Sequence, residues 1–77
     1  MQNLSIAELA VLCRKDWKNV NYAARPYLEA MYSLSSIDDS YGFDSGRGVV
    51  AYFLSNAASW RGDVAKAVKA ELKRRLK

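Results

Sequence analysis

Apolar residues near the start of the chain recur with the spacing of one helix face. They occupy positions i, i+3, i+4, i+7 and i+11, at Ile6, Leu9, Ala10, Cys13 and Trp17. Just before them, Ser5 and Glu8 form an S-x-x-E capping box, which marks a helix N-terminus. The pattern predicts a first helix from Ile6 to about Trp17, with Cys13 in the core.

Two further helices follow from the same reasoning. Pro26 suits a first helical turn, and the stripe behind it ends at two serines; its members are Tyr27, Leu28, Met31 and Leu34. Asp44 or Ser45 then caps a third helix. That helix is apolar over most of its circumference and is therefore expected to be central and buried; its apolar residues are Val49, Val50, Phe53, Leu54, Ala57 and Ala58.

The last segment predicts a fourth, amphipathic helix capped by Ser59. One face is apolar, with Trp60, Val64, Ala67, Val68, Leu72 and Leu76, and the other is basic, with Lys66, Lys69, Lys73 and Lys77. Gly62 is either an early residue of this helix or a break between two helices. Between the second and third helices, residues 36–48 are rich in Gly, Ser and Asp and predict a turn region without strands. Tyr41 and Phe43 are expected to fix this region to the core. The expected fold is all-α: a single domain over residues 1–77, folded as a compact bundle of three to four helices.

Length and composition restrict how such a domain is stabilised. A chain of 77 residues buries a limited share of its surface. Cys13 is the only cysteine and histidine is absent, which excludes an internal disulfide and leaves no ligand set for zinc. The domain must therefore be stabilised by good packing of its core or by self-association. Tyr22 and Tyr32 lie off the apolar stripes, and surplus tyrosine is typical of interfaces, so we expect a homo-oligomer. The lone thiol and the lack of a signal peptide or an apolar membrane span predict a cytoplasmic protein that does not bind membranes.

Charge is divided unevenly along the chain. Residues 60–77 hold seven basic and two acidic residues, a net charge of +5, whereas residues 29–44 hold four acidic and no basic residues. A basic end can bind phosphates or the acidic middle of another copy. Equally, it can be a solvated helix face whose cations favour the helix C-terminus.

Catalytic chemistry has little support in the sequence. The usual general base, histidine, is absent, and Cys13 lies on an apolar stripe. Asp38, Asp39 and Asp44 do not have the spacing of a calcium-binding EF-hand and suit capping and turns. We therefore expect a protein that is not an enzyme and has neither catalytic residues, metal nor cofactor.

Two helix starts are candidate ligand sites. At the first, Ser45, Gly46, Arg47 and Gly48 combine free backbone N–H groups with a guanidinium, which together can bind an anion; capping alone is the simpler interpretation. At the second, Trp60 and Arg61, with Lys66 nearby, can stack on a base and bind a phosphate. Alternatively, Trp60 simply heads the core face of the last helix.

Residues 26–73 also show a family pattern. Its characteristic pieces are Tyr41-Gly42 with Asp44, the run 52–54 with 56–57, and Trp60-Arg61-Gly62. In these pieces the chain resembles short helical proteins encoded by bacteriophages and prophages. The resemblance implies a viral accessory protein, such as an inhibitor of host defence, a ligand-sequestering oligomer or a host-takeover factor. It supplies no catalytic residues.

The sequence thus predicts a non-enzymatic, self-associating accessory protein of phage type. Its expected ligand is a nucleotide or another anion, or else an acidic host protein. One alternative is a small DNA- or RNA-binding protein that uses the basic face of residues 66–77. Another is a structural subunit of a larger assembly.

Overall fold

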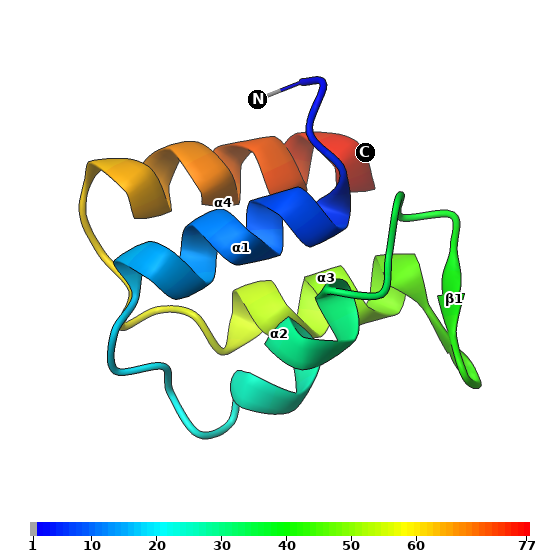
Figure 1. Cartoon of the computed structure of the whole chain (residues 1–77), viewed down its shortest axis with the longest axis horizontal. Helices are drawn as coiled ribbons and strands as arrows, with labels where there is room; N and C mark the ends of the chain where they lie inside the picture. Colours follow the sequence, from blue (N-terminus) through cyan, green and yellow to red (C-terminus); the bar gives the residue numbers. More distant parts are fainter. Residues whose placement is uncertain (1) are drawn as a thin grey trace.

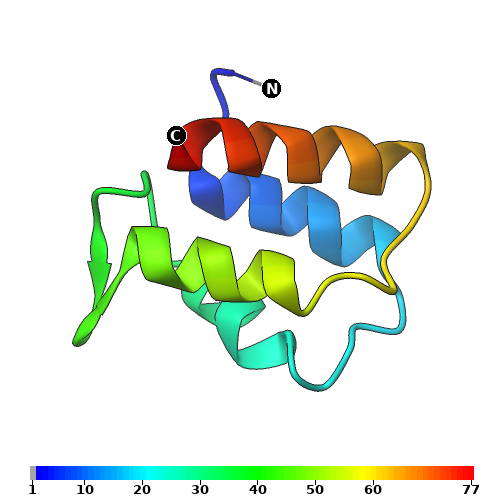
Figure 2. The ribbon, with the colours of Figure 1, turned by 180° about the vertical axis from the view of Figure 1, so that it is seen from behind.

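The computed structural model describes residues 2–77. In this range it contains four helices and one two-stranded sheet: α1 (Ile6–Asp16), α2 (Arg25–Met31), β1 (Ser40–Tyr41), β2 (Asp44–Ser45), α3 (Gly46–Ser55) and α4 (Asp63–Leu76). α1 lies beside α4, and α2 lies beside α3 (Figures 1 and 2). The predicted helical bundle is therefore present, but the fold is not purely all-α. None of the helices within residues 2–77 is long and apolar enough to span a membrane.

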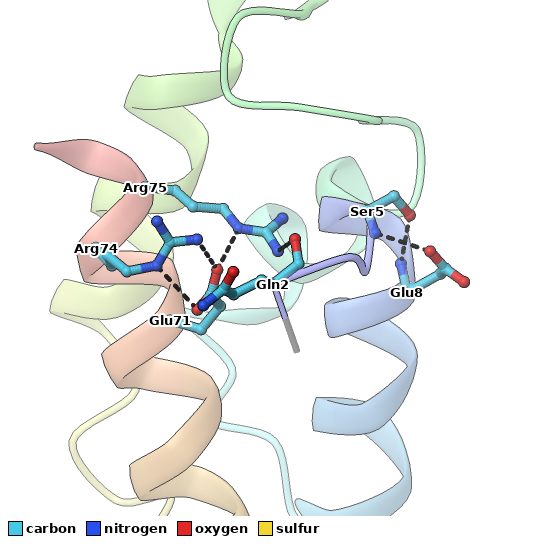
Figure 3. A network of polar contacts seen from close by, with 6 residues as sticks. All are labelled: Gln2, Ser5, Glu8, Glu71, Arg74 and Arg75. Carbon is cyan, nitrogen blue, oxygen red and sulfur yellow. Dashed lines mark hydrogen bonds and ion pairs between the residues drawn. The ribbon is translucent and has the colours of Figure 1, made fainter.

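The predicted capping box begins α1. The backbone N–H of Ser5 donates to Glu8 Oε1 over 2.8 Å, and the N–H of Glu8 donates to Ser5 Oγ over 3.0 Å (Figure 3). The next N–H groups, of Ile6 and Ala7, donate to carbonyls of residues 35 and 34 just after α2. The N–H groups that a helix start leaves without intrahelical partners thus join α1 to the end of the α2 segment.

A single core cluster draws side chains from all four helices. Within it, the rings of Trp17 and Trp60 are stacked with centroids 5.8 Å apart, and Phe53 meets Trp17 edge-on at 6.3 Å. Cys13 is fully buried, as predicted. Burial raises the pKa of its thiol to about 12, so the thiol stays protonated and unreactive.

The start of α4 differs from the prediction. Ser59 does not cap it; Gly62 is the N-cap, with φ of 112°, so this glycine is the break between α3 and α4. The buried face of α4 also differs in part. Val68 and Leu72 are buried as predicted, and Ala65 joins them, whereas Val64 and Ala67 are exposed.

The structure differs from the prediction a second time in the turn region. Residues 40–45 form an antiparallel hairpin that pairs Ser40 with Ser45 and Tyr41 with Asp44. Gly42, at φ of 62°, opens its two-residue turn, a conformation that glycine adopts without strain. The prediction that Tyr41 and Phe43 fix this region to the core is wrong, since they are 46% and 110% exposed. Ile37 packs against the core instead.

An ion-pair network closes the other end of α4. Glu71 is 9% exposed and accepts hydrogen bonds from both Arg74 and Arg75. Arg75 also donates to the carbonyl of Gln2 over 3.2 Å (Figure 3). The bonds from Arg74 and Arg75 lower the pKa of Glu71 from 4.5 to about 2. The segment before α1 is thereby held against α4.

The first testable site is Gly46, whose N–H donates to Asp39 O over 2.6 Å. A Cβ here would lie 2.7 Å from Asp39 O and 2.9 Å from Ile37 O, both backbone atoms. We expect Gly46→Ala to lower the free energy of unfolding by about 1–3 kcal/mol, because the backbone must shift. At the neighbouring Gly48 the nearest atom is the Ser45 hydroxyl at 3.2 Å. Gly48→Ala should therefore cost much less; equal losses in urea denaturation would contradict the close contact.

The ion pairs of Glu71 make the stability of the fold depend on pH in the acid range. Because the folded-state pKa of Glu71 lies below its ordinary value, its contribution to stability is complete above that ordinary value and is lost as pH falls toward 2. Glu71→Gln removes this dependence while keeping the shape. The wild type should therefore lose more stability than the variant between about pH 5 and pH 2.5. Glu29→Gln is the matched control, since within residues 2–77 Glu29 has no side-chain hydrogen bond or ion pair. Parallel pH profiles for wild type and Glu71→Gln would contradict the prediction.

Candidate functional site

The first predicted site, residues 45–48, forms the first turn of α3. Ser45 is the N-cap, and its hydroxyl accepts from the N–H of Gly48 over 3.0 Å. Gly46 is buried, and its N–H bonds to Asp39 O. Two of the backbone donors that suggested an anion site are thus bonded within the chain.

Arg47 also has partners within the chain. Its Nη1 donates to the carbonyl of Leu76 over 2.7 Å, and its Nη2 lies 4.0 Å from Asp38 Oδ1. The cation therefore sits at the carbonyl end of α4, where the helix dipole is negative. Arg47 joins the start of α3 to the end of α4, a contact between residues 29 positions apart.

At the second predicted site, Trp60 is a core residue and is 2% exposed. One face of its ring lies on Trp17, and its Nε1 donates to Asp16 Oδ2 over 2.8 Å. This matches the alternative in which Trp60 belongs to the core, although the residue precedes α4 and is not part of it. The ring has no open face for a base.

Arg61 and Lys66, by contrast, are exposed and lie together. With Lys69 they surround a cavity of about 450 Å³ at the start of α4, lined also by Trp60, Gly62, Asp63 and Ala65. This end of α4 is remote from the Arg47 contact, because a 14-residue helix is about 20 Å long. The structure therefore groups Trp60, Arg61 and Lys66 and separates them from residues 45–48.

Lys69 also lines this cavity, which the sequence did not indicate. Its Nζ donates to the carbonyls of Ala57 and Trp60, both over 2.6 Å, and lies 5.8 Å from the Trp60 ring centroid. Burial lowers the pKa of Lys69, and the neighbouring Lys73 and Arg61 act in the same direction. A predicted solvent-side lysine is thus half-buried under the link between α3 and α4.

The start of α4 adds the positive end of its dipole to these cations. Gly62 has no side chain to cap the helix, and the first helical hydrogen bond runs from Lys66 N to Gly62 O. Among residues 2–77, neither Arg61 nor Lys66 forms an ion pair. Asp63 is the one acidic residue of the cavity lining. The site as a whole favours anions.

A second cavity, which we call the α1–α2 cavity, was not anticipated from the sequence. It has a volume of about 170 Å³ and is lined by Arg14, Lys18, Val20, Arg25, Leu28, Glu29 and Tyr32. Burial raises the pKa of the Tyr32 hydroxyl, which therefore remains a hydrogen-bond donor. Arg14 lies in the last turn of α1 and Lys18 follows just after the helix ends, and the packing of α2 against this end of α1 makes the cavity.

No family model matches the chain, and neither a curated protein nor a solved structure matches it. Within residues 2–77, no three His, Cys, Asp or Glu side chains gather as a metal site would require. The two cavities and the exposed surfaces are therefore the features that indicate a function.

Proposed function

We propose that this chain is a non-catalytic binding domain that holds a phosphate-bearing small ligand, such as a nucleotide, at the start of α4. The observation that supports this is the cavity of about 450 Å³ at which Arg61, Lys66 and Lys69 converge. It is an open depression of the surface, so a ligand would be held there mainly by charge and hydrogen bonds and less by enclosure. Its cations and the helix start suit a group of phosphate oxygens.

Each cation has a distinct role in this proposal. Arg61 presents a planar fork of donors that fits two oxygens of one phosphate, and Lys66 adds a mobile point charge. Lys69 already donates to the carbonyls of Ala57 and Trp60 with two of its three N–H groups, so it would contribute mainly its charge to ligand binding. Because the Trp60 ring is buried, the site recognises the phosphate more than the base.

We also propose the biological setting that the resemblance to phage proteins implies. In it, the chain is a self-associating accessory protein in the host cytoplasm that counters a host defence. It would do so by sequestering a nucleotide or by binding an acidic surface of a host protein. The excess of cations at residues 60–77 supports either anionic target.

The binding proposal is tested by titrating the protein with adenosine triphosphate and with inorganic phosphate in a calorimeter. Arg61→Ala and Lys66→Ala should each weaken triphosphate binding at least about tenfold, because each removes charge-assisted hydrogen bonds. Both side chains are exposed, so the thermal midpoint should not change.

Lys77→Ala is the matched control, since it removes the same charge from an exposed position at the far end of α4. Arg47→Ala, the other cation first associated with an anion site, should lower stability through the lost bond to Leu76 O and leave affinity unchanged. Equal affinities for wild type, Arg61→Ala and Lys66→Ala would refute the site.

Nucleic-acid binding is the second candidate, and one observation favours it. Lys66, Lys73 and Lys77 are all exposed and follow one another along α4, over about 16 Å of helix axis. Such a stripe, continued from Arg61, suits a run of backbone phosphates.

This candidate predicts a steep salt dependence. The logarithm of the DNA association constant should fall linearly with the logarithm of salt concentration, and Lys73→Ala should reduce that slope by about 0.9. Lys15→Ala, an exposed lysine on α1, is the control and should leave the slope unchanged. Fluorescence anisotropy with a short labelled duplex measures both. Weak binding that does not change from low to physiological salt would exclude this candidate.

A further inference from the structure

The β1–β2 hairpin presents an aromatic side chain at the far end of the molecule. Phe43 is fully exposed at the turn, and Tyr41 beside it is half-exposed. The hairpin is held in place at its base, because β2 runs directly into α3 and the N–H of Gly46 bonds to Asp39 O. Phe43 therefore projects from a supported arm, and binding through it would cost little ordering entropy.

The hairpin is also acidic. Asp44 is exposed next to Phe43, and the Asp38 side chain is 85% exposed on the approach to β1. The carboxylate of Asp39, by contrast, accepts from the N–H groups of Ser35 and Ser36 and is used within the chain. Asp38 is shared with Arg47, whose Nη2 lies 4.0 Å from its Oδ1, so Asp44 is the carboxylate left beside Phe43. An aromatic side chain next to an exposed carboxylate suits a receptor with both apolar and basic lining residues.

The α1–α2 cavity has those properties. Two of its lining residues, Val20 and Leu28, are apolar and buried, and Arg14, Lys18 and Arg25 line it together with one acid, Glu29. Within residues 2–77 none of these three cations forms an ion pair. The volume of about 170 Å³ is close to that of a cavity known to hold a benzene ring, about 150 Å³. It therefore has room for the ring of one phenylalanine.

The two surfaces cannot meet within one molecule. The longest axis measures 30 Å. The hairpin lies at one end of this axis, and the connection between α1 and α2 lies at the other, in both views (Figures 1 and 2). A copy that places its hairpin in the cavity of a second copy still has its own cavity open.

We propose that copies of this chain assemble head to tail, with Phe43 of one copy inserted in the α1–α2 cavity of the next and its Asp44 facing Arg14, Lys18 and Arg25. The contact is heterologous, so it produces a ring or an open filament and not a two-fold dimer. A standard interface takes about 800 Å² from each partner, so head and tail together would cover about a third of the 4962 Å² surface. Arg61, Lys66 and Lys69 at the start of α4 are not among the residues that line the α1–α2 cavity.

The experiment uses two variants that each disable one side of the contact. Phe43→Ser removes the aromatic ring from an exposed turn, and Arg25→Glu reverses a charge at the first residue of α2, where a helix start favours an acid. Both should fold as the wild type does. Sedimentation velocity and native mass spectrometry follow mass over a range of protein concentrations. Tyr52→Ser is the control, because Tyr52 is 60% exposed on α3 and its ring stacks on Tyr27, and neither residue belongs to the hairpin or to the cavity lining.

The wild type should grow beyond dimers as its concentration rises, and the growth should diminish at ~1 M salt, where charges are screened within about 3 Å. Each variant should require at least about tenfold higher concentration to associate. An equimolar mixture of the two should form a 1:1 heterodimer and nothing larger, because one functional cavity and one functional hairpin remain between them. The proposal is overturned if the wild type stays monomeric, if Phe43→Ser assembles normally, or if the mixture forms no heterodimer. It is also overturned if Tyr52→Ser loses assembly while Phe43→Ser and Arg25→Glu keep it. Triphosphate titration of monomeric Phe43→Ser tests the site at α4 independently.

Discussion

The insertion of Trp60 between α1 and α4 is the contact on which the rest of the structure depends. The link between α3 and α4 crosses the end of the bundle, where its backbone polar groups must find partners. Lys69 donates to two of its carbonyls, and Asp16 accepts the indole N–H of Trp60. The stacked rings of Trp17 and Trp60 join the end of α1 to the link, and Lys69 joins the link to α4. No buried side-chain N or O atom within residues 2–77 lacks a partner, so this polar insertion adds little desolvation cost.

The same contact determines the candidate ligand site. With Trp60 buried, Arg61 emerges beside the start of α4, and Gly62 makes the turn into the helix at a φ that other residues rarely adopt. Lys66 then lies one turn into α4 on the side of Arg61. The three cations meet because a core side chain fixes the link, although they are spread over nine residues of sequence. Their shared anion preference is a by-product of packing at Trp60 and Lys69.

Local signals predicted the helices well, and non-local contacts explain the failures. The capping box and the spacing of apolar residues involve neighbours in sequence, so α1 and the existence of α2, α3 and α4 follow from them. The start of α4 depends on Trp60, whose partners lie on α1. The hairpin is too short to show alternation. The bond of Arg47 to Leu76 O and the cavity between α1 and α2 join segments distant in sequence, and no local pattern indicates them.

The fold also separates side chains that stabilise it from those left available for binding. Arg47, Trp60 and Lys69 looked from sequence like ligand-binding or solvent-facing groups, yet each is bonded within the chain. In a domain of 77 residues the core is small, and long polar side chains supplement it by satisfying helix ends and buried carbonyls. Phe43 is exposed, and Arg14 and Arg25 form no ion pair within residues 2–77, so these side chains do not stabilise the fold in this way. Phe43 exposes apolar surface to water at a free-energy cost, and covering it in a basic cavity of a second copy would remove that cost and bring opposite charges together.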